Sequence, residues 1–354
     1  MRYLSDGDVD ALARKCTANP RPSRMSHRPS AASGQSQTHE HPMSDQRRSC
    51  HACGLSAAVE ALYRKGAYTI LRCRSCGLVF TDPHPTHEEL ERIYSESFFQ
   101  VGEKFAGQSR SPGMLNAERR ARWLLEQRGV TAGRWLDVGC ATGDFMMAAR
   151  PHVAQISGIE MSSYAADRAR ARGLLDVTNG DALDVSLSAD PFDVVTMWDV
   201  VEHVIDPQAV LQRASTLLRD GGVLALSTGD IESLAARLMG RFWHLMIPPR
   251  HLYFFSPSTI ARLLDRAGFD TVSVSRPGKC VPLDFAFWKA ATLITPRAGP
   301  VALRLSAAAH LGRLAPFVNL GDIMTVLARK RPSSAPGMTK VPDVGGQQPD
   351  PLAS

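Results

Sequence analysis

The amino-acid sequence predicts an α/β fold that follows a small cysteine-rich module. Between residues 131 and 330, short β-type runs alternate with helical segments, which is typical of parallel strands joined by helical crossovers. The first of these strands ends in a glycine turn, and two Cys-x-x-Cys pairs lie upstream of it. The alternation gives the fold class, while the turn and the cysteines indicate where ligands bind.

Seven strands are predicted in the α/β region. Each is a short run of β-branched, aromatic or aliphatic residues bounded by turn residues. The seven runs are 135–138, 155–159, 175–178, 193–198, 223–227, 271–275 and 323–328. Helices are expected at 163–171, 207–218 and 258–267. The last two begin after Asp or Ser and end near Gly, as capped helices do.

Composition divides the 354 residues into five segments. Residues 1–49 are rich in Ser, Pro, Arg and His without an apolar period, and we expect a disordered tail. The cysteine module spans 50–82, and a helical connector spans 83–130. The α/β domain covers 131–330. A second Pro- and Gly-rich tail, 331–354, is also expected to be disordered.

The net charge of +6 lies mostly in the tails. Residues 1–49 hold eight Arg or Lys against five Asp or Glu, and residues 330–354 hold three against two. The remaining body carries about +2, so it lacks the concentrated basic face of a nucleic-acid-binding protein. No run of about 20 apolar residues predicts a membrane-spanning helix. Four of the seven cysteines form Cys-x-x-Cys pairs rather than a disulfide framework, and no secretory signal pattern is recognised, so we expect a reducing, cytoplasmic setting.

Two Cys-x-x-Cys pairs, separated by nineteen residues, predict a zinc site. Cys50 and Cys53 would form one knuckle and Cys73 and Cys76 the other. Four thiolates would then hold one tetrahedral Zn²⁺ in a closed site, whose role is structural because no coordination position is left for chemistry. A glycine follows the second cysteine of each pair, where a turn with positive φ is favourable. The alternative is a redox-active Cys-x-x-Cys, but two such pairs would be redundant and neither opens a helix after a strand.

The strand at 135–138 runs into the sequence Leu-Asp-Val-Gly-Cys-Ala-Thr-Gly-Asp-Phe at 136–145. Its two glycines let the backbone approach a ligand that lies across the carboxyl end of the sheet. Acidic residues recur at later strand ends: Glu160 in Gly-Ile-Glu-Met, Asp181 in Gly-Asp-Ala and Asp199 in Met-Trp-Asp. Through these motifs, in this order, the chain resembles the class I S-adenosylmethionine (SAM)-dependent methyltransferases.

The resemblance implies a seven-stranded, Rossmann-like sheet with the last strand antiparallel, and a small zinc-ribbon-like module before it. It also implies a SAM site. Asp137 would face the ammonium group of SAM directly or through water, Glu160 would accept both ribose hydroxyls, and Asp181 would accept from the adenine amine. The other cofactor residues would line the methionine part, the adenine and one wall of the pocket: Gly139, Gly143, Ala182, Trp198 and Asp199. An NAD-binding domain is the alternative, but the Gly-x-Gly-x-x-Gly spacing is replaced by Gly-x3-Gly.

The segment after the strand at 193–198 supplies candidate catalytic residues. Asp199, Glu202 and His203 form a motif that resembles the divalent-cation segment of some quinone O-methyltransferases, where Glu stands in place of Asp199. Three such ligands could bind Mg²⁺ with water completing the octahedron. His203 could instead be a general base, because its unperturbed pKa lies near neutrality. Glu202 and His203 could also merely cap a turn and shape the pocket. His251, in Pro-Arg-His-Leu, is a second candidate base.

Two amphipathic inserts, 231–255 and 285–321, are expected to overhang the reaction face. Both intersperse large apolar residues with basic ones, and 285–321 contains no Asp or Glu. Such segments lie on anionic membrane surfaces or cover an apolar substrate, although a lid packed on the core explains them equally well. In the quinone methyltransferases that the chain resembles, the segment after the fifth strand touches lipid. The motif at 76–86, Cys-Gly-Leu-Val-Phe-Thr-Asp-Pro-His-Pro-Thr, is also similar to sugar C-methyltransferases and to proteins of polysaccharide biosynthesis.

Together these features predict a zinc-containing enzyme that transfers a methyl group from SAM to a small-molecule or lipid-linked acceptor. A glycan or polysaccharide precursor is one candidate acceptor. Two other classes remain open. An RNA methyltransferase with a zinc module for recognition is disfavoured by the near-neutral body, and a non-catalytic partner protein is disfavoured by the intact cofactor acids. We expect a cytoplasmic protein, and the amphipathic inserts make peripheral contact with a membrane one possible arrangement.

Overall fold

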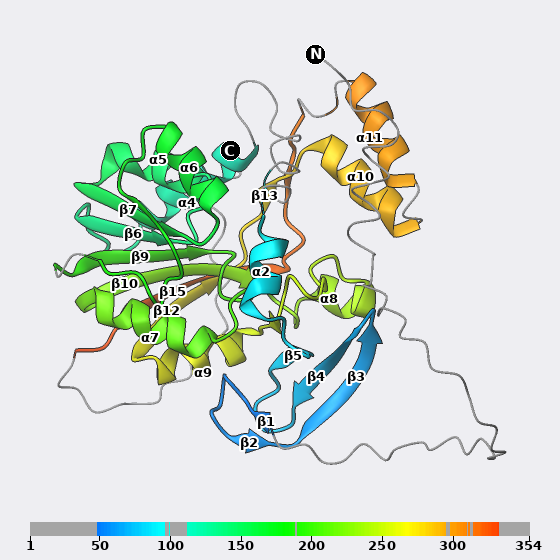
Figure 1. Ribbon diagram of the computed structural model, residues 1–354, viewed down its shortest axis with the longest axis horizontal. Helices are drawn as coiled ribbons and strands as arrows, with labels where there is room; N and C mark the ends of the chain where they lie inside the picture. The colour runs from blue at the N-terminus through cyan, green and yellow to red at the C-terminus, as the bar shows by residue number, and fades with distance from the viewer. Residues whose placement is uncertain are drawn as a thin grey trace, which may run out of the picture.

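The computed structural model describes residues 48–95, 99, 112–187, 190–294, 298–309, 311 and 314–332. Nearly all of both predicted tails, and the middle of the predicted connector, lie outside these residues. Figure 1 shows an α/β layer structure on one side of the molecule, with the cysteine module and a helical hairpin on the other.

A seven-stranded sheet forms the centre of the described part of the chain (Figure 1). Its spatial order is β12-β15-β10-β9-β6-β7-β8. The strands are β6 (Arg134–Val138), β7 (Gln155–Glu160), β8 (Val177–Asn179), β9 (Phe192–Trp198), β10 (Leu218–Gly229), β12 (Phe269–Ser275) and β15 (Ile323–Lys330). The pairs from β10 to β8 are parallel, whereas β15 is antiparallel to both β10 and β12. The predicted fold class, with its reversed last strand, is therefore confirmed.

Helices cover both faces of this sheet (Figure 1). One face carries α4 (Pro112–Leu125), α5 (Asp144–Ala149), the short η1 (Arg150–His152) and α6 (Ser163–Ala171); the other carries α7 (Pro207–Leu217) and α9 (Pro257–Arg266). The caps explain where helices begin. Asp206 accepts a hydrogen bond from the Ala209 amide at 3.0 Å, and Ser256 forms a capping box with Thr259, each before a proline at the first helical position. Strand side chains between the two layers are buried, Trp135 and Phe192 among the largest.

The cysteine module folds as a two-stranded antiparallel ribbon followed by three strands of a four-stranded antiparallel sheet. Its elements are β1 (Arg48–Ser49), β2 (Ser56–Ala57), β3 (Val59–Lys65), β4 (Tyr68–Cys73) and β5 (Val79–Asp82), followed by α2 (His87–Ile93). The strand order is β11-β5-β4-β3, and β11 (Tyr253–Phe254) comes from the segment predicted as the first amphipathic insert. The α/β part of the chain thus contributes an edge strand to the module.

The second insert forms a helical hairpin that stands away from the sheet (Figure 1). Helices α10 (Leu283–Ile294) and α11 (Ala298–Ala308) pack on each other, and a two-stranded ribbon of β13 (Lys279–Cys280) and β14 (Phe317–Val318) closes their base. The first insert contains α8 (Leu234–Met239) and the short η2 (Gly240–Phe242). Within the described residues, no helix combines the length and apolar character needed to cross a bilayer.

Candidate active site

The carboxyl ends of β6, β7 and β9 bring the predicted acids to one edge of the sheet. Strand β6 lies between β9 and β7, and all three are parallel. Asp137 therefore lies beside Thr196 of β9, while Glu160 ends β7 and Asp199 follows β9. This is the edge at which open α/β sheets bind ligands.

The glycine turn after β6 requires its two glycines. Gly139 and Gly143 have φ of +71° and +85°, and a Cβ on them would lie 2.6 Å from Val200 Cγ2 and 2.2 Å from Leu174 Cδ1, respectively. Larger residues would therefore clash as well as strain the backbone. Ala141, between them, also has a positive φ of 49°. Such uncommon backbone conformations recur at functional sites.

Glu160 is buried and holds the turn to β7. Its Oε2 accepts a hydrogen bond from the Ala141 amide and its Oε1 accepts one from the Ser162 amide, both at 2.8 Å. Burial raises the pKa of Glu160, and the amide donors partly offset this. A carboxylate has about four acceptor positions, so capacity remains for two hydroxyl donors from a ligand.

Asp137 bridges two strands rather than lying open. It is buried, and its Oδ1 accepts a hydrogen bond of 2.6 Å from the Thr196 hydroxyl on β9. Burial raises the pKa of Asp137 to about 7, although the Thr196 hydrogen bond and the charge of Arg120 act in the opposite direction. This carboxyl titrates near neutral pH.

Asp199 is held as a carboxylate by a residue that the sequence did not reveal. The Arg120 guanidinium, from α4, lies 2.6 Å from its Oδ2, and the Ser227 hydroxyl donates to its Oδ1 at 2.8 Å. Partial desolvation would raise the pKa of Asp199, but the charges of Arg120 and Lys279 and these hydrogen bonds hold that pKa well below the usual range. Its side chain is 46% exposed, so the charge is available to a ligand. The φ of Asp199 is +56°, the second such non-glycine position at this edge.

Trp198 and the β8 end complete the predicted cofactor set. The Trp198 ring is buried, lies 5.2 Å from the Phe145 ring and has the Arg120 guanidinium 5.0 Å above it. Its Nε1 is buried and has no hydrogen-bond partner in the described part of the chain. Asp181 follows β8, and its Oδ1 accepts from the Leu183 amide at 2.8 Å; Ala182 next to it packs against the core.

A second cluster lies just beyond Asp199. One ligating atom each from Glu202, His203 and His251 lies within 4.8 Å of the others, and the two imidazole rings are 4.7 Å apart. Glu202 is 3% exposed, and its Oε2 has no hydrogen-bond partner among the described residues. The sequence motif grouped Asp199 with Glu202 and His203, whereas the structure puts His251 in that place and pairs Asp199 with Arg120.

The hydrogen bonds around His203 fix its tautomer. Its Nδ1 lies 2.7 Å from the Arg250 carbonyl oxygen and 2.7 Å from the Tyr94 hydroxyl oxygen. A carbonyl oxygen can only accept, so we assign the ring proton to Nδ1 and leave the Nε2 lone pair as the acceptor. Tyr94 itself donates to the same carbonyl at 3.3 Å. Tyr94 was not singled out by sequence, since a lone tyrosine after a helix carries no motif.

Electrostatics keep this cluster uncharged near neutral pH. Burial lowers the pKa of His203, and burial together with the neighbouring His203 lowers that of His251 to about 3. Burial and the charge of Asp199 raise the pKa of Glu202 to about 8. Two imidazoles and one carboxyl do not match the oxygen-rich coordination of Mg²⁺, so the structure gives the predicted Mg²⁺ site no support.

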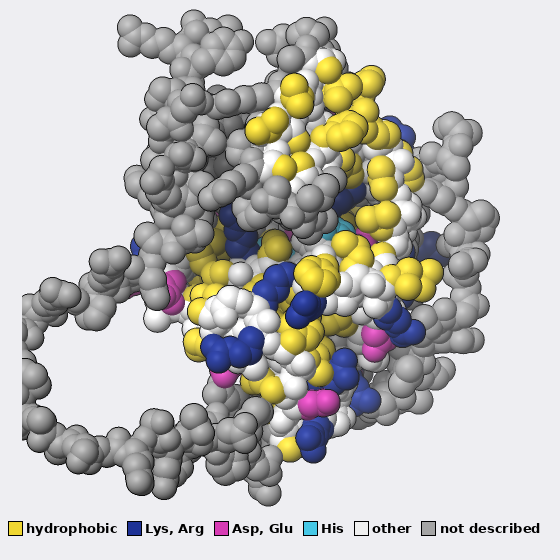
Figure 2. All heavy atoms as spheres, turned by 90° about the vertical axis from the view of Figure 1, so that its right-hand side faces the viewer, with side chains coloured by type: hydrophobic (Ala, Val, Ile, Leu, Met, Phe, Trp, Pro, Cys, Tyr) yellow, Lys and Arg dark blue, Asp and Glu magenta, His cyan; other side chains and the backbone are white. Residues whose placement is uncertain are grey.

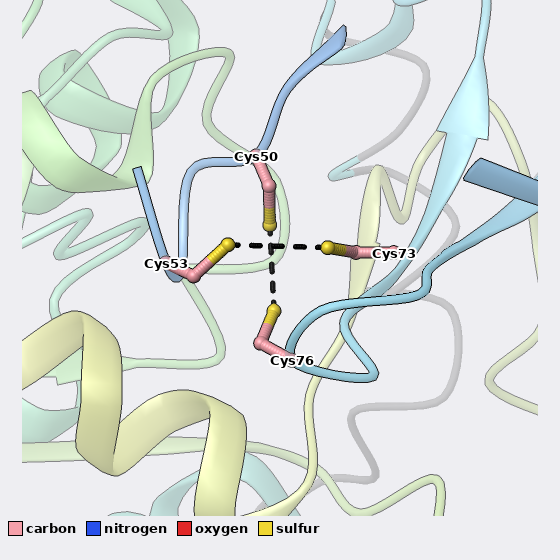
Figure 3. A group of neighbouring side chains, drawn as sticks. All are labelled: Cys50, Cys53, Cys73 and Cys76. Atoms are coloured by element: carbon pink, nitrogen blue, oxygen red, sulfur yellow. Dashed lines mark hydrogen bonds between the residues drawn. The ribbon is translucent and has the colours of Figure 1, made fainter. Parts of the chain in front are cut away.

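The four predicted zinc ligands converge on one point (Figure 3). Cys50 Sγ lies 3.5 Å from Cys76 Sγ, and Cys53 Sγ lies 3.9 Å from Cys73 Sγ. A tetrahedral Zn²⁺ with Zn–S bonds of about 2.3 Å has an S···S edge of about 3.8 Å, so the observed spacing fits that metal. Each knuckle is closed by a glycine amide that donates to the first cysteine's carbonyl, at 2.7 and 2.9 Å.

Comparison with known proteins identifies the family of the chain. A family model described as a methyltransferase domain matches residues 109–274. The ubiquinone biosynthesis O-methyltransferase of Thiobacillus denitrificans is 32% identical over 167 residues, which are 43% of this chain and 71% of that protein. The enzyme of that name from Aromatoleum aromaticum is 29% identical over 44% of this chain and 71% of its own length.

Among solved structures, magnesium protoporphyrin IX methyltransferase from Synechocystis PCC 6803 with bound SAH aligns with a TM-score of 0.47. The identity is 12%, over 69% of this chain and 100% of that chain. The residues that the family model matches include the glycine turn, Glu160, Asp199 and His203. The chain belongs to the SAM-dependent methyltransferases.

Proposed function

We propose that this methyltransferase methylates a hydroxyl oxygen of a small, largely apolar acceptor, with His203 as the general base. The observation that carries the proposal is the fixed tautomer of His203. Its Nδ1–H is held by the Arg250 carbonyl, so the Nε2 lone pair is free to take a proton. Burial lowers the pKa of His203, which keeps the imidazole neutral at physiological pH.

We propose the cofactor contacts from the positions of the acidic residues at this edge of the sheet. Glu160 would accept the ribose hydroxyls with its remaining lone pairs, and Asp181 would meet the adenine beside Ala182. The carboxylate of Asp199 and the unpartnered Nε1 of Trp198 would line the pocket beyond the glycine turn. We propose that Asp137 lies behind this layer, because it is buried and its Oδ1 already accepts from the Thr196 hydroxyl.

In the proposed reaction, bound SAM supplies a methyl group on a sulfonium, which is already activated for displacement. His203 Nε2 would accept the proton of the acceptor hydroxyl while that oxygen forms its bond to the methyl carbon. The bond between the methyl carbon and sulfur would break, with its electron pair left on the sulfur of the departing thioether. Arg250 stabilises the resulting imidazolium through its carbonyl, which already accepts from Nδ1 at 2.7 Å. Glu202, buried and with a raised pKa, adds no competing negative charge in its protonated form.

An exposed apolar surface on the first insert supports an apolar acceptor. Helix α8 exposes Leu234 at 73% and Leu238 at 78%, and the turn after it exposes Phe242 at 60%. Arg237 and Arg241 are exposed alongside. Figure 2 shows hydrophobic side chains over this region and the α10–α11 hairpin, interspersed with Lys and Arg. An apolar face with a basic fringe suits an anionic membrane surface, from which a lipid-like acceptor would enter.

The relatives support an oxygen acceptor, since their names place them in ubiquinone biosynthesis as O-methyltransferases. Those names do not support a glycan precursor, which is the other candidate acceptor.

We further propose that the four cysteines hold one structural Zn²⁺, because their spacing fits a closed tetrahedral site.

The test is transfer of labelled methyl from SAM to an apolar catechol or hydroquinone in vesicles, with wild type and His203→Gln compared. Removing a general base typically lowers the rate by about 10²–10⁴-fold, and we expect that loss in kcat with SAM affinity unchanged. His152→Gln is the matched control, because it makes the same change at an exposed histidine of η1 that is not part of the histidine cluster. A fully active His203→Gln would refute the base assignment, and SAM binding without turnover on any hydroxyl acceptor would favour a non-catalytic role.

A further inference from the structure

Two continuous connections run from the cysteine cluster to His203. Cys73 and Cys76 flank the knuckle that leads into β5. Strand β5 pairs with β11 on one side and, after Asp82, the chain continues into α2. One route ends at His251 and the other at Tyr94, and both residues touch His203.

The first connection is a ladder of backbone hydrogen bonds. The Thr81 amide, in β5, donates to the Leu252 carbonyl at 2.8 Å, and the Leu252 amide donates to the Glu202 carbonyl at 2.8 Å. Leu252 is therefore clamped between the cysteine module and the segment that carries Glu202 and His203. Its chain neighbour His251 is held against His203 by the same clamp, with the rings 4.7 Å apart.

The second connection is helix α2. Thr86 caps its start with a capping box to Glu89, and Leu90 on its inner face is buried. Tyr94 lies at its end, where the amide of Tyr94 donates to the Leu90 carbonyl at 2.9 Å. The Tyr94 hydroxyl oxygen then lies 2.7 Å from His203 Nδ1. The helix is short and well capped, so the position of Tyr94 follows the position of the module.

The module is also fastened to the α/β part away from the histidines. Lys65 donates to the Met246 carbonyl at 2.5 Å and to the Arg241 carbonyl at 3.0 Å, and the Arg266 guanidinium donates to the His51 carbonyl. Lys65 ends β3 and His51 lies in the first cysteine knuckle, so these contacts join the module to the α/β part at two further places.

We propose that the cysteine module is the positioning element of the histidine centre, with Tyr94 as its positioning residue. The module sets the ring orientation of His203, whose tautomer is set by the Arg250 carbonyl. The inference rests on the proposed function in one respect, that His203 is the base. The SAM side of the pocket is fixed separately, because the amides of Gly139 and Cys140 donate to the Ile159 carbonyl of β7 at 2.8 and 3.1 Å.

The first experiment replaces Tyr94 with Phe, which removes only the hydroxyl. Tyr68→Phe, in β4 of the same module, is the matched control. A hydrogen bond of ordinary net strength predicts a kcat lower by roughly threefold to tenfold, with the SAM dissociation constant unchanged. The ¹⁵N shift of His203 Nδ1, which reports the hydrogen bonds at that atom, should change in Tyr94→Phe and stay as in wild type in Tyr68→Phe, while the Arg250 carbonyl keeps the proton on Nδ1 in both. Unchanged His203 shifts in Tyr94→Phe would overturn the positioning role, whatever the activity.

The second experiment uses the full chain before and after treatment with a zinc chelator, beside a Cys76→Ser variant. We expect SAM affinity within about threefold of the untreated protein, since β6 and β7 hold that half of the site. We also expect faster amide exchange at Tyr253 and Phe254 and a kcat lowered at least tenfold. The proposal would be contradicted if the metal-free protein kept the wild-type kcat although amide exchange in β11 had become faster.

The two proposals fail in distinguishable ways. If His203→Gln stays active, the base assignment fails, yet the ¹⁵N shifts still report whether Tyr94 and the module orient the ring. If His203→Gln is inactive while Tyr94→Phe and the chelated protein keep both rate and ring shifts, the base stands and the positioning role fails.

Discussion

Replacing Glu160 with Gln tests the cofactor site at its most constrained acid. Glu160 accepts one backbone amide on each oxygen, from Ala141 and from Ser162. A glutamine has one oxygen, so one of these amides must face an NH₂ group. Leaving a buried donor without an acceptor costs about 1–3 kcal/mol of the free energy of unfolding. The variant should fold, with the glycine turn loosened.

The effect on SAM should be larger than the effect on stability. Glu160→Gln removes the charge and leaves at most one oxygen to accept from two ribose hydroxyls. One charge-assisted hydrogen bond is lost and another weakened, which sums to about 2–4 kcal/mol, or a 30- to 1,000-fold rise in Kd. Calorimetric titration with SAM, alongside urea denaturation, measures both effects.

The control for this variant is Asp144→Asn, which removes a carboxylate from the same turn. Asp144 points to Arg172 at 2.7 Å and not toward Glu160, so we expect a Kd within about threefold of wild type. A Glu160→Gln protein that binds SAM as tightly as Asp144→Asn would refute the placement of the ribose.

Three further outcomes follow from the electrostatics. Burial raises the pKa of Asp137 from 3.8 to about 7, so the folded protein loses stability as the pH rises from about 4 to 7 and this carboxyl ionises. In urea denaturation, Asp137→Asn should therefore raise the free energy of unfolding by up to about 4 kcal/mol at pH 8 and change it little at pH 4. An equal change at both pH values would contradict this. Arg120→Met removes the charge that lowers the pKa of Asp199, so the SAM affinity of this variant should fall as the pH drops from 8 to 5.5, while the SAM affinity of wild type changes less. The same pH dependence of SAM affinity in both proteins would contradict this. Because burial lowers the pKa of His203, kcat/KM should rise with an apparent pKa below 6.5 and level off by about pH 7.5; a rising limb centred above pH 7 would exclude a neutral His203 as the base.

The parts of the fold that sequence predicted are those encoded locally. The turn at Gly139 and Gly143 needs positive φ and close packing, which only glycine permits, and this leaves a readable pattern. Cys50, Cys53 and the second pair are readable for a similar reason, since metal ligands must be few and regularly spaced. The reversed β15 followed from resemblance, because nothing in its own apolar run specifies direction.

The missed features join residues that are far apart and chemically ordinary. Arg120 reaches Asp199 across 79 positions, and Tyr94 reaches His203 across 109. Strand β11 is two residues long, too short for an alternating pattern, so its pairing with β5 could not be predicted. These contacts depend on tertiary packing. The same packing pairs Asp199 with Arg120 and brings His251 to Glu202 and His203.

The most direct test of the account is a single-turnover reaction of SAM-loaded protein with an apolar catechol or hydroquinone in anionic vesicles, followed by identification of the methylated atom. We predict a methyl ether on the acceptor oxygen, formed by wild type and slowed at least 100-fold in His203→Gln, consistent with the loss of a general base. A methyl group on carbon or nitrogen, or equal rates for the two proteins, would contradict O-methylation with His203 as the base.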